Sequence, residues 1–227
     1  MPRITLIHAV THSIAPINTQ MERLWPEATR TNLLDDSLSV DLARVKRGFD
    51  ETMFTRFREL ADYAKSTGTN GILFTCSAFG PYVDAVAKHL APMPVLKPNE
   101  AMIADAVALL KKPGTTGYQG KLGLMSTFDL ALESMPAEFP AGFPLLPQMV
   151  DGALHALNQG DTATHDHLIA NAARQLAQRG CTALALAQFS MARAKDVAQN
   201  ASGLPVLTTP ASAVAMLRRR LSSPTAK

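Results

Sequence analysis

Two cysteines, Cys76 and Cys181, are the residues of this 227-residue chain that are best suited to chemistry. A thiolate can remove a proton from carbon or attack an electrophile, and a thiol can return a proton. A zinc site would need further cysteine or histidine ligands at short spacing, and the sequence has no such pattern, so we expect no metal. The pair therefore indicates acid/base or nucleophilic chemistry, unless both thiols are small apolar residues of the core.

The surroundings of Cys76 favour a ligand site. The stretch GILFTC is typical of a buried strand that ends in Cys76, and Ser77 and Ala78 follow it before a helix predicted to begin near residues 79–82. In parallel α/β sheets, ligands bind outside the carboxyl ends of the strands, where helix N-termini offer free N–H groups and favour a thiolate. Cys181 differs, because it precedes the strand-like stretch TALALA, which leaves its position in the fold less defined.

The elements that would position these thiols follow a regular alternation. Short apolar runs alternate with longer amphipathic segments, which predicts an α/β fold with a parallel sheet covered by helices. The longest predicted helix covers residues 41–68, where Val45, Phe49 and Phe57 keep helical spacing and Gly68 is a suitable C-terminal stop. The predicted strands are RITLIHA, TNLLD, GILFTC, MPVLK, KLGLMS, FPLLP, TALALA and LPVLT.

The second half of the chain repeats the order of the first, with a strand, a helix and then an apolar strand beside a cysteine. Such self-similarity indicates a duplicated α/β unit. We predict one domain of residues 1–97, which the segment 205–227 joins, and a second domain of residues 98–204. Each domain would then carry one cysteine.

Cysteines in equivalent positions of two such halves can face one cleft. A thiolate on one side of a carbon and a thiol on the other can exchange the proton of a stereocentre, because one removes it and the other replaces it on the opposite face. The sequence has no phosphate-binding loop, no context for a pyridoxal-phosphate lysine and no dinucleotide fingerprint. We therefore expect a reaction that uses no cofactor.

Four motifs resemble those of the aspartate/glutamate racemase superfamily, which also includes hydantoin and allantoin racemases, maleate isomerases and arylmalonate decarboxylases. TCSAFG is similar to the first cysteine motif and GCTALALAQFSMA to the second. LGLMST resembles the strand before the first helix of the second half, and KPNEAMIADA resembles the segment that leads into that half. The resemblance implies two pseudo-symmetric flavodoxin-like halves with parallel sheets, an active site in the cleft between them, and no cofactor.

The resemblance also implies roles for particular residues. Cys76 and Cys181 would form the acid/base pair. A group of neighbours would bind the substrate and its carboxylate, namely Ser77, Ala78, Thr182, Ser126 and Thr127. Beside these roles, His8 or His12 could orient the substrate or a thiolate, unless the histidine is a hydrogen-bonded structural residue. Gln188, Phe189 and Ser190 could line the pocket. The chain departs from many amino-acid racemases of the family, because it lacks their acidic residue near the end of the first strand and their His-Tyr-Pro-like sequence after the second Cys-Thr.

The predicted function is racemisation or epimerisation at a carbon made acidic by a neighbouring carboxylate or carbonyl, in an amino acid, a hydantoin or a related compound. One alternative is cis-trans isomerisation of an unsaturated dicarboxylate by a nucleophilic cysteine. Decarboxylation is less favoured, because those family members resemble racemases with only one of the two cysteines. Outside the enzymes, the alternative is a small-molecule binding domain in which both thiols pack in the core.

Composition restricts the partners. The formal net charge is +3, and the basic cluster Arg218–Arg220 has no interleaved aromatic residues, so we expect no nucleic-acid partner. No apolar run approaches the roughly 20 residues that span a bilayer. The first residues also lack the pattern of a secretion signal, so we expect a cytoplasmic protein without membrane association. The expected partner is a small carboxylate-bearing substrate, bound by a homo-oligomer.

Overall fold

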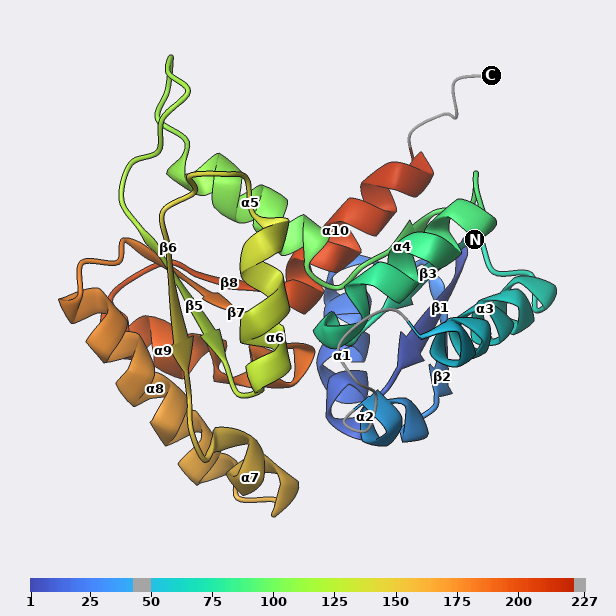
Figure 1. Ribbon diagram of the computed structural model, residues 1–227, viewed down its shortest axis with the longest axis horizontal. Coiled ribbons are helices and arrows are strands. Elements are labelled where there is room, and N and C mark those ends of the chain that lie inside the picture. Colours follow the sequence, from blue (N-terminus) through green and yellow to red (C-terminus); the bar gives the residue numbers. More distant parts are fainter. Residues whose placement is uncertain (43–49, 223–227) are drawn as a thin grey trace. The chain divides into compact units, whose positions relative to one another are not determined.

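The computed structural model describes residues 1–42 and 50–222 (Figure 1). Two compact units divide these residues. The first unit contains Met1–Pro98 and the segment from Ala213 onward, and the second unit contains Asn99–Ser212. Each unit has its own parallel sheet and its own buried core.

The first unit has a four-stranded parallel sheet with the order β2-β1-β3-β4. Its central strands are almost completely buried, whereas the edge strand β2 is partly exposed. The strands are β1 (Arg3–His8), β2 (Thr29–Leu34), β3 (Gly71–Phe74) and β4 (Val95–Leu96). The helical elements are η1 (Thr11–Ser13), α1 (Ile14–Leu24), α2 (Ser37–Leu42), α3 (Glu51–Ser66), η2 (Ser77–Phe79) and α4 (Gly80–His89).

The second unit repeats this plan, with the strand order β6-β5-β7-β8. The strands are β5 (Leu122–Ser126), β6 (Leu145–Met149), β7 (Ala183–Leu186) and β8 (Val206–Thr208). The helical elements are α5 (Glu100–Leu110), α6 (Asp129–Ser134), η3 (Met135–Glu138), α7 (Ala153–Asn158), α8 (Thr162–Gln178), η4 (Phe189–Ala194) and α9 (Lys195–Ser202). The final helix, α10 (Thr209–Ser222), begins in this unit and continues into residues of the first.

Alternating side chains of the second sheet build a core on each of its faces, as the pleat of a strand requires. Met125 and Leu184 pack with the residues of α8 and α9. Leu124 and Ala185 pack with α5 and α6 on the opposite face. The sheet is therefore covered on both faces, which is typical of parallel sheets (Figure 1).

The duplication predicted from the sequence extends to the register of the strands. In the first sheet Ile7 of β1 lies opposite Phe74 of β3, and in the second sheet Met125 of β5 lies opposite Leu186 of β7. The order of strands around these pairs is the same. Phe74 and Leu186 are therefore equivalent positions, each at the carboxyl end of its strand.

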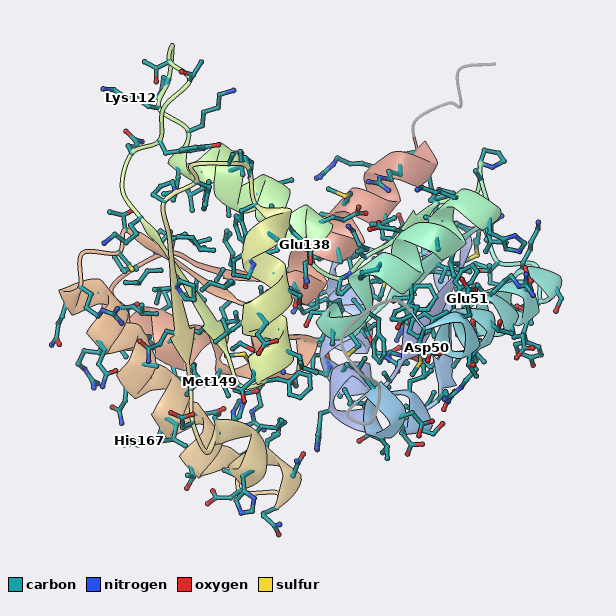
Figure 2. All side chains as sticks on the ribbon, viewed as in Figure 1. Asp50, Glu51, Lys112, Glu138, Met149 and His167 are labelled. Atoms are coloured by element: carbon teal, nitrogen blue, oxygen red, sulfur yellow. The ribbon has the colours of Figure 1, made fainter. Side chains whose placement is uncertain are left out.

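The predicted fold class is confirmed, and each of the predicted strands is present. The prediction of one continuous helix over residues 41–68 is wrong. Asp50 has an extended backbone and caps a new helix, because its side chain accepts a hydrogen bond of 2.7 Å from the N–H of Met53; Figure 2 labels Asp50 beside Glu51 at this start of α3. Val45 and Phe49 lie outside the described residues.

The boundary of the second unit also differs from the predicted one. β8 pairs in parallel with β7, so the residues from Val206 to Thr208 complete the second sheet. The chain rejoins the first unit from Ala213, later than the predicted position 205. Within the described ranges, no helix is both long enough and apolar enough to cross a membrane.

Candidate functional site

Cys76 lies at the carboxyl end of the first sheet. It is the second residue after β3 and the N-cap of η2, which leads into α4. Ligands of parallel α/β sheets bind at this end of the strands, so the predicted placement of Cys76 at such a position is met. Its side chain is partly buried against the aromatic cluster of the first core. A very small cavity of about 10 Å³, with room for a water molecule at most, adjoins the thiol and is lined also by Ile7, His8, Ala9, Leu38, Phe57, Phe74 and Phe79.

The surroundings of Cys76 keep its thiol protonated. Desolvation by burial raises the pKa of Cys76 from 9.0 to about 11, and the backbone N–H of Ala78, which would stabilise a thiolate, offsets this only in part. The sequence suggested instead that the following helix would favour the thiolate. The apolar wall of Phe57 and Phe79 explains the difference, because desolvation outweighs one hydrogen bond here. At neutral pH, the Cys76 thiol is therefore protonated.

A buried polar network lies beside Cys76. His8 ends β1; its Nε2 lies 2.9 Å from Oδ1 of Asn32, and its Nδ1 lies 2.8 Å from the hydroxyl of Thr75. The same Oδ1 accepts a hydrogen bond from Asn18, which assigns it as the oxygen and gives the proton of His8 to Nε2. Thr75 then donates to Nδ1. Burial lowers the pKa of His8 against the effect of Asn32, so the ring is neutral and joins β1, β2 and the residue before Cys76.

This network contains residues that sequence reasoning missed. Thr75, Asn32 and Ser13 were not predicted; the hydroxyl of Ser13 lies 3.1 Å from that of Thr75. Of the three, only Thr75 carried a signal in the sequence, namely polarity at the end of a predicted strand. Of the two histidines that the sequence offered, His8 belongs to this network, and His12 lies next to it in η1 and is partly exposed.

Gln188 occupies in the second unit the position that Cys76 occupies in the first. It is the second residue after β7, whose last residue Leu186 is equivalent to Phe74, and it is the N-cap of η4 as Cys76 is of η2. The sequence predicted a role for Gln188 in lining the site but not this equivalence. The second carboxyl edge therefore carries an amide where the first carries a thiol.

The side chain of Gln188 is held by two predicted site residues. Its Oε1 lies 2.7 Å from the backbone nitrogen of Thr127, 2.9 Å from the Thr127 hydroxyl and 3.0 Å from the Ser126 hydroxyl. Ser126 is completely buried and Thr127 is 5% exposed, whereas Gln188 is partly exposed. Ser126, Thr127 and Gln188 thus form one cluster at the carboxyl ends of β5 and β7.

The predicted equivalence of Cys181 with Cys76 is wrong. Cys181 precedes β7, and its N–H donates to the carbonyl of Leu176 at the end of α8. It lies at the amino end of the strand, and the seven residues to Gln188 span roughly 20 Å of extended chain. Its side chain is 4% exposed and packs in the core with α8 and α9, and burial raises its pKa against the opposing charges of Lys121 and Arg179.

Thr182 shares the amino edge with Cys181. Its hydroxyl lies 3.2 Å from the backbone nitrogen of Lys121, where it joins the start of β7 to the residue before β5. The position of Thr182 therefore differs from the predicted carboxylate-binding one. Ser77 and Ala78 do lie at the carboxyl edge, in η2 directly after Cys76, and Ser77 is buried. In the described ranges, no cluster of three or more His, Cys, Asp or Glu side chains could hold a metal ion.

Comparisons with known proteins agree with this fold. A family model described as Asp/Glu/Hydantoin racemase matches residues 29–217. A glutamate racemase from Bacillus anthracis has a similar structure with a TM-score of 0.71 and 12% identity, covering 97% of this chain and 81% of that chain. Allantoin racemase from Klebsiella pneumoniae gives a TM-score of 0.71 and 17% identity, covering 98% of this chain and 88% of that chain. The structure of unliganded arylmalonate decarboxylase gives a TM-score of 0.59 and 12% identity, covering 99% of this chain and 95% of that chain. No curated protein matches the sequence significantly.

Proposed function

The chain belongs to the Asp/Glu/hydantoin racemase family, and we propose that it is an enzyme of this type that needs no cofactor. In the proposed reaction, the Cys76 thiol delivers a proton to one face of a carbon beside a carboxylate. The observation that carries the proposal is the pair of equivalent positions, with a thiol at Cys76 and an amide at Gln188. Family membership supports the enzyme class. The residues at the two positions support the limitation to one face.

The amide of Gln188 limits the reaction because it neither gives nor takes a proton at neutral pH. Racemisation through two groups needs a proton donor on one face of the carbon and a base on the other. The position of Cys181 at the amino end of β7, where it is buried in the core, argues against it as the second group. We therefore take Cys181 out of the proposed mechanism and keep Cys76 as its acid.

The protonated state of Cys76 favours a reaction that begins without a base. Loss of CO2 from a malonate-type diacid meets this requirement: the C–C bond to the leaving carboxylate breaks, and its electron pair stays on the carbon as an enolate of the remaining carboxylate. The Cys76 thiol then gives its proton to that carbon, and the thiolate takes a proton from water. The net reaction that we propose is the decarboxylation of a small substituted diacid. Arylmalonate decarboxylase, whose fold is similar, is named for a reaction of this kind.

The remaining carboxylate is proposed to bind at Ser126 and Thr127. Both are buried at the carboxyl end of β5, and their hydroxyls together with the Thr127 N–H converge within 3.0 Å of a single acceptor oxygen. Such donors stabilise the negative charge of a carboxylate and of the enolate that replaces it. This part of the proposal agrees with the carboxylate site that the family resemblance implies.

The test is a reaction screen in D2O with substituted malonates, amino acids and hydantoins. We expect release of 13C-bicarbonate from a labelled malonate, with one deuteron added to the product, as measured by NMR. The change Cys76→Ser should abolish the protonation step, while the same change at the other cysteine, Cys181→Ser, should leave turnover intact. Proton exchange of an amino acid or hydantoin that requires both cysteines would instead establish the two-thiol racemase and refute the proposal.

A further inference from the structure

The amide oxygen of Gln188 lies among three polar groups at the end of β5. The Thr127 N–H, at 2.7 Å, and the Thr127 hydroxyl, at 2.9 Å, donate to Oε1. The Ser126 hydroxyl lies 3.0 Å from Oε1 and 3.0 Å from the carbonyl oxygen of Phe128, so its one proton has two possible acceptors. Ser126 Oγ also accepts a hydrogen bond from the N–H of Phe128, which fixes its position. The donors are buried at the end of β5, so they keep their positions whether or not the Gln188 side chain is hydrogen-bonded to them.

The orientation of the amide follows from these contacts. A backbone N–H can only donate, so the Gln188 atom 2.7 Å from Thr127 N must be the oxygen and not the nitrogen. Oε1 is therefore fixed among the donors. Gln188 itself is partly exposed, in contrast to Ser126 and Thr127, so its side chain borders solvent.

We infer that the Gln188 amide oxygen is an internal substitute for a substrate carboxylate, and that a small carboxylate binds at Ser126 and Thr127 by displacing it. This inference deepens the proposed function and rests on it for the identity of the substrate as a carboxylate. A carboxylate oxygen in the same place accepts charge-assisted hydrogen bonds from the Thr127 N–H and hydroxyl and competes with the Phe128 carbonyl for the Ser126 proton; such bonds are roughly twice as strong as those to a neutral amide. The exchange thus favours an anion over a neutral amide or ester.

Occupation of the subsite by the Gln188 side chain weakens the apparent affinity for the anion. While Oε1 fills the subsite, only the fraction of molecules with a displaced Gln188 can bind the anion, so the apparent Kd exceeds the intrinsic one by the inverse of that fraction. Removing the side chain should therefore tighten anion binding. A merely structural role for Gln188 predicts the opposite, because loss of this hydrogen-bonded partner would disorder the donors.

The experiment measures malonate binding without turnover, by following the Thr127 amide resonance in 15N-threonine-labelled protein. Gln188→Ala should bind malonate at least about tenfold more tightly than the wild type, which corresponds to a subsite that is filled in about nine molecules of ten. The exposed Gln178 provides a matched control, and Gln178→Ala should bind as the wild type does. Unchanged or weaker binding in Gln188→Ala would overturn the inference.

A second variant keeps the inference testable if Gln188→Ala does not fold. Gln188→Glu is nearly isosteric, and its carboxylate should occupy the donors permanently, so malonate should no longer shift the Thr127 resonance. Normal malonate binding in Gln188→Glu would contradict the inference. The same titration with Cys76→Ser separates the two proposals: tight binding to the Gln188→Ala, Cys76→Ser double variant supports the subsite even if the screen finds no decarboxylation.

Discussion

The ionisation of Cys76 offers a sharp prediction, because acid catalysis and nucleophilic catalysis require opposite protonation states. With a pKa of about 11, about one molecule in a thousand carries the thiolate at pH 8. An unperturbed thiol with a pKa of 9.0 would be about one tenth ionised at that pH. Alkylation, which proceeds through the thiolate, should therefore be about 100-fold slower at Cys76 than at an unperturbed cysteine.

The assay is carbamidomethylation of the Cys181→Ser variant by iodoacetamide, followed by intact mass between about pH 7 and pH 10.5. Cys76 is then the single thiol in the chain, since the sequence has two cysteines. The rate should rise about tenfold per pH unit over the whole range, without a plateau. The same variant unfolded in urea provides the control and should level off near its ordinary pKa.

The shape of this profile distinguishes the pKa from simple steric protection. Poor access to Cys76 would lower the rate by the same factor at every pH and would leave the plateau where an ordinary thiol has it. A plateau below about pH 8.5 in the folded protein would mean a stabilised thiolate at neutral pH. That result would refute the assignment of Cys76 as an acid and favour the nucleophilic isomerase mechanism.

Three further predictions concern Gln188, the first core and pH. Gln188→Cys places a thiol at the position equivalent to Cys76, so this variant should exchange the α-proton of the product on both faces and racemise it, as chiral chromatography would detect; a product that stays enantiopure would argue against the equivalence. Phe57, which stacks on Phe74 and Tyr82 and is 1% exposed, should lose about 3–5 kcal/mol of unfolding free energy in Phe57→Ala, measured by urea denaturation; a loss below about 1 kcal/mol would contradict the packing. The Cys76 thiol has a pKa near 9.0 in the unfolded chain and near 11 in the folded one, so the unfolded state loses its proton first as the pH rises. The unfolding free energy of the wild type relative to Cys76→Ser should therefore fall by about 2 kcal/mol between these two pH values. A difference that does not change with pH would contradict the raised pKa.

The strands were predictable because each combines a short apolar run with flanking turn residues. GILFTC, for example, contains the strand Gly71–Phe74, which is buried along its whole length. The break before α3 was not predicted, because the apolar spacing continues through Asp50 while its side chain caps a new helix. Periodicity describes which face is apolar, but a capping hydrogen bond decides where the helix begins.

The position of Cys181 could not be read from its motif. Cysteine is small and apolar, so it suits either end of a buried strand, and TALALA does not show where pairing ends. The end is set by contacts with β5, in which Ala183 lies opposite Leu122 and Leu186 lies opposite Met125. The contacts of Gln188 are likewise tertiary, because its partners lie more than 60 positions earlier in the chain. Sequence reasoning therefore found Ser126, Thr127 and Gln188 as single candidates but not as one cluster.

The central claim is that Cys76 alone delivers the proton, and the stereochemistry of the product tests it most directly. A prochiral malonate with two different substituents on its central carbon is converted in D2O. Chiral chromatography with mass spectrometry then gives the enantiomeric composition and the deuterium content of the monoacid. We predict one enantiomer carrying a single deuteron from both the wild type and Cys181→Ser, and no enzymatic product from Cys76→Ser. A racemic deuterated product from the wild type, or an inactive Cys181→Ser variant that remains folded, would contradict the account.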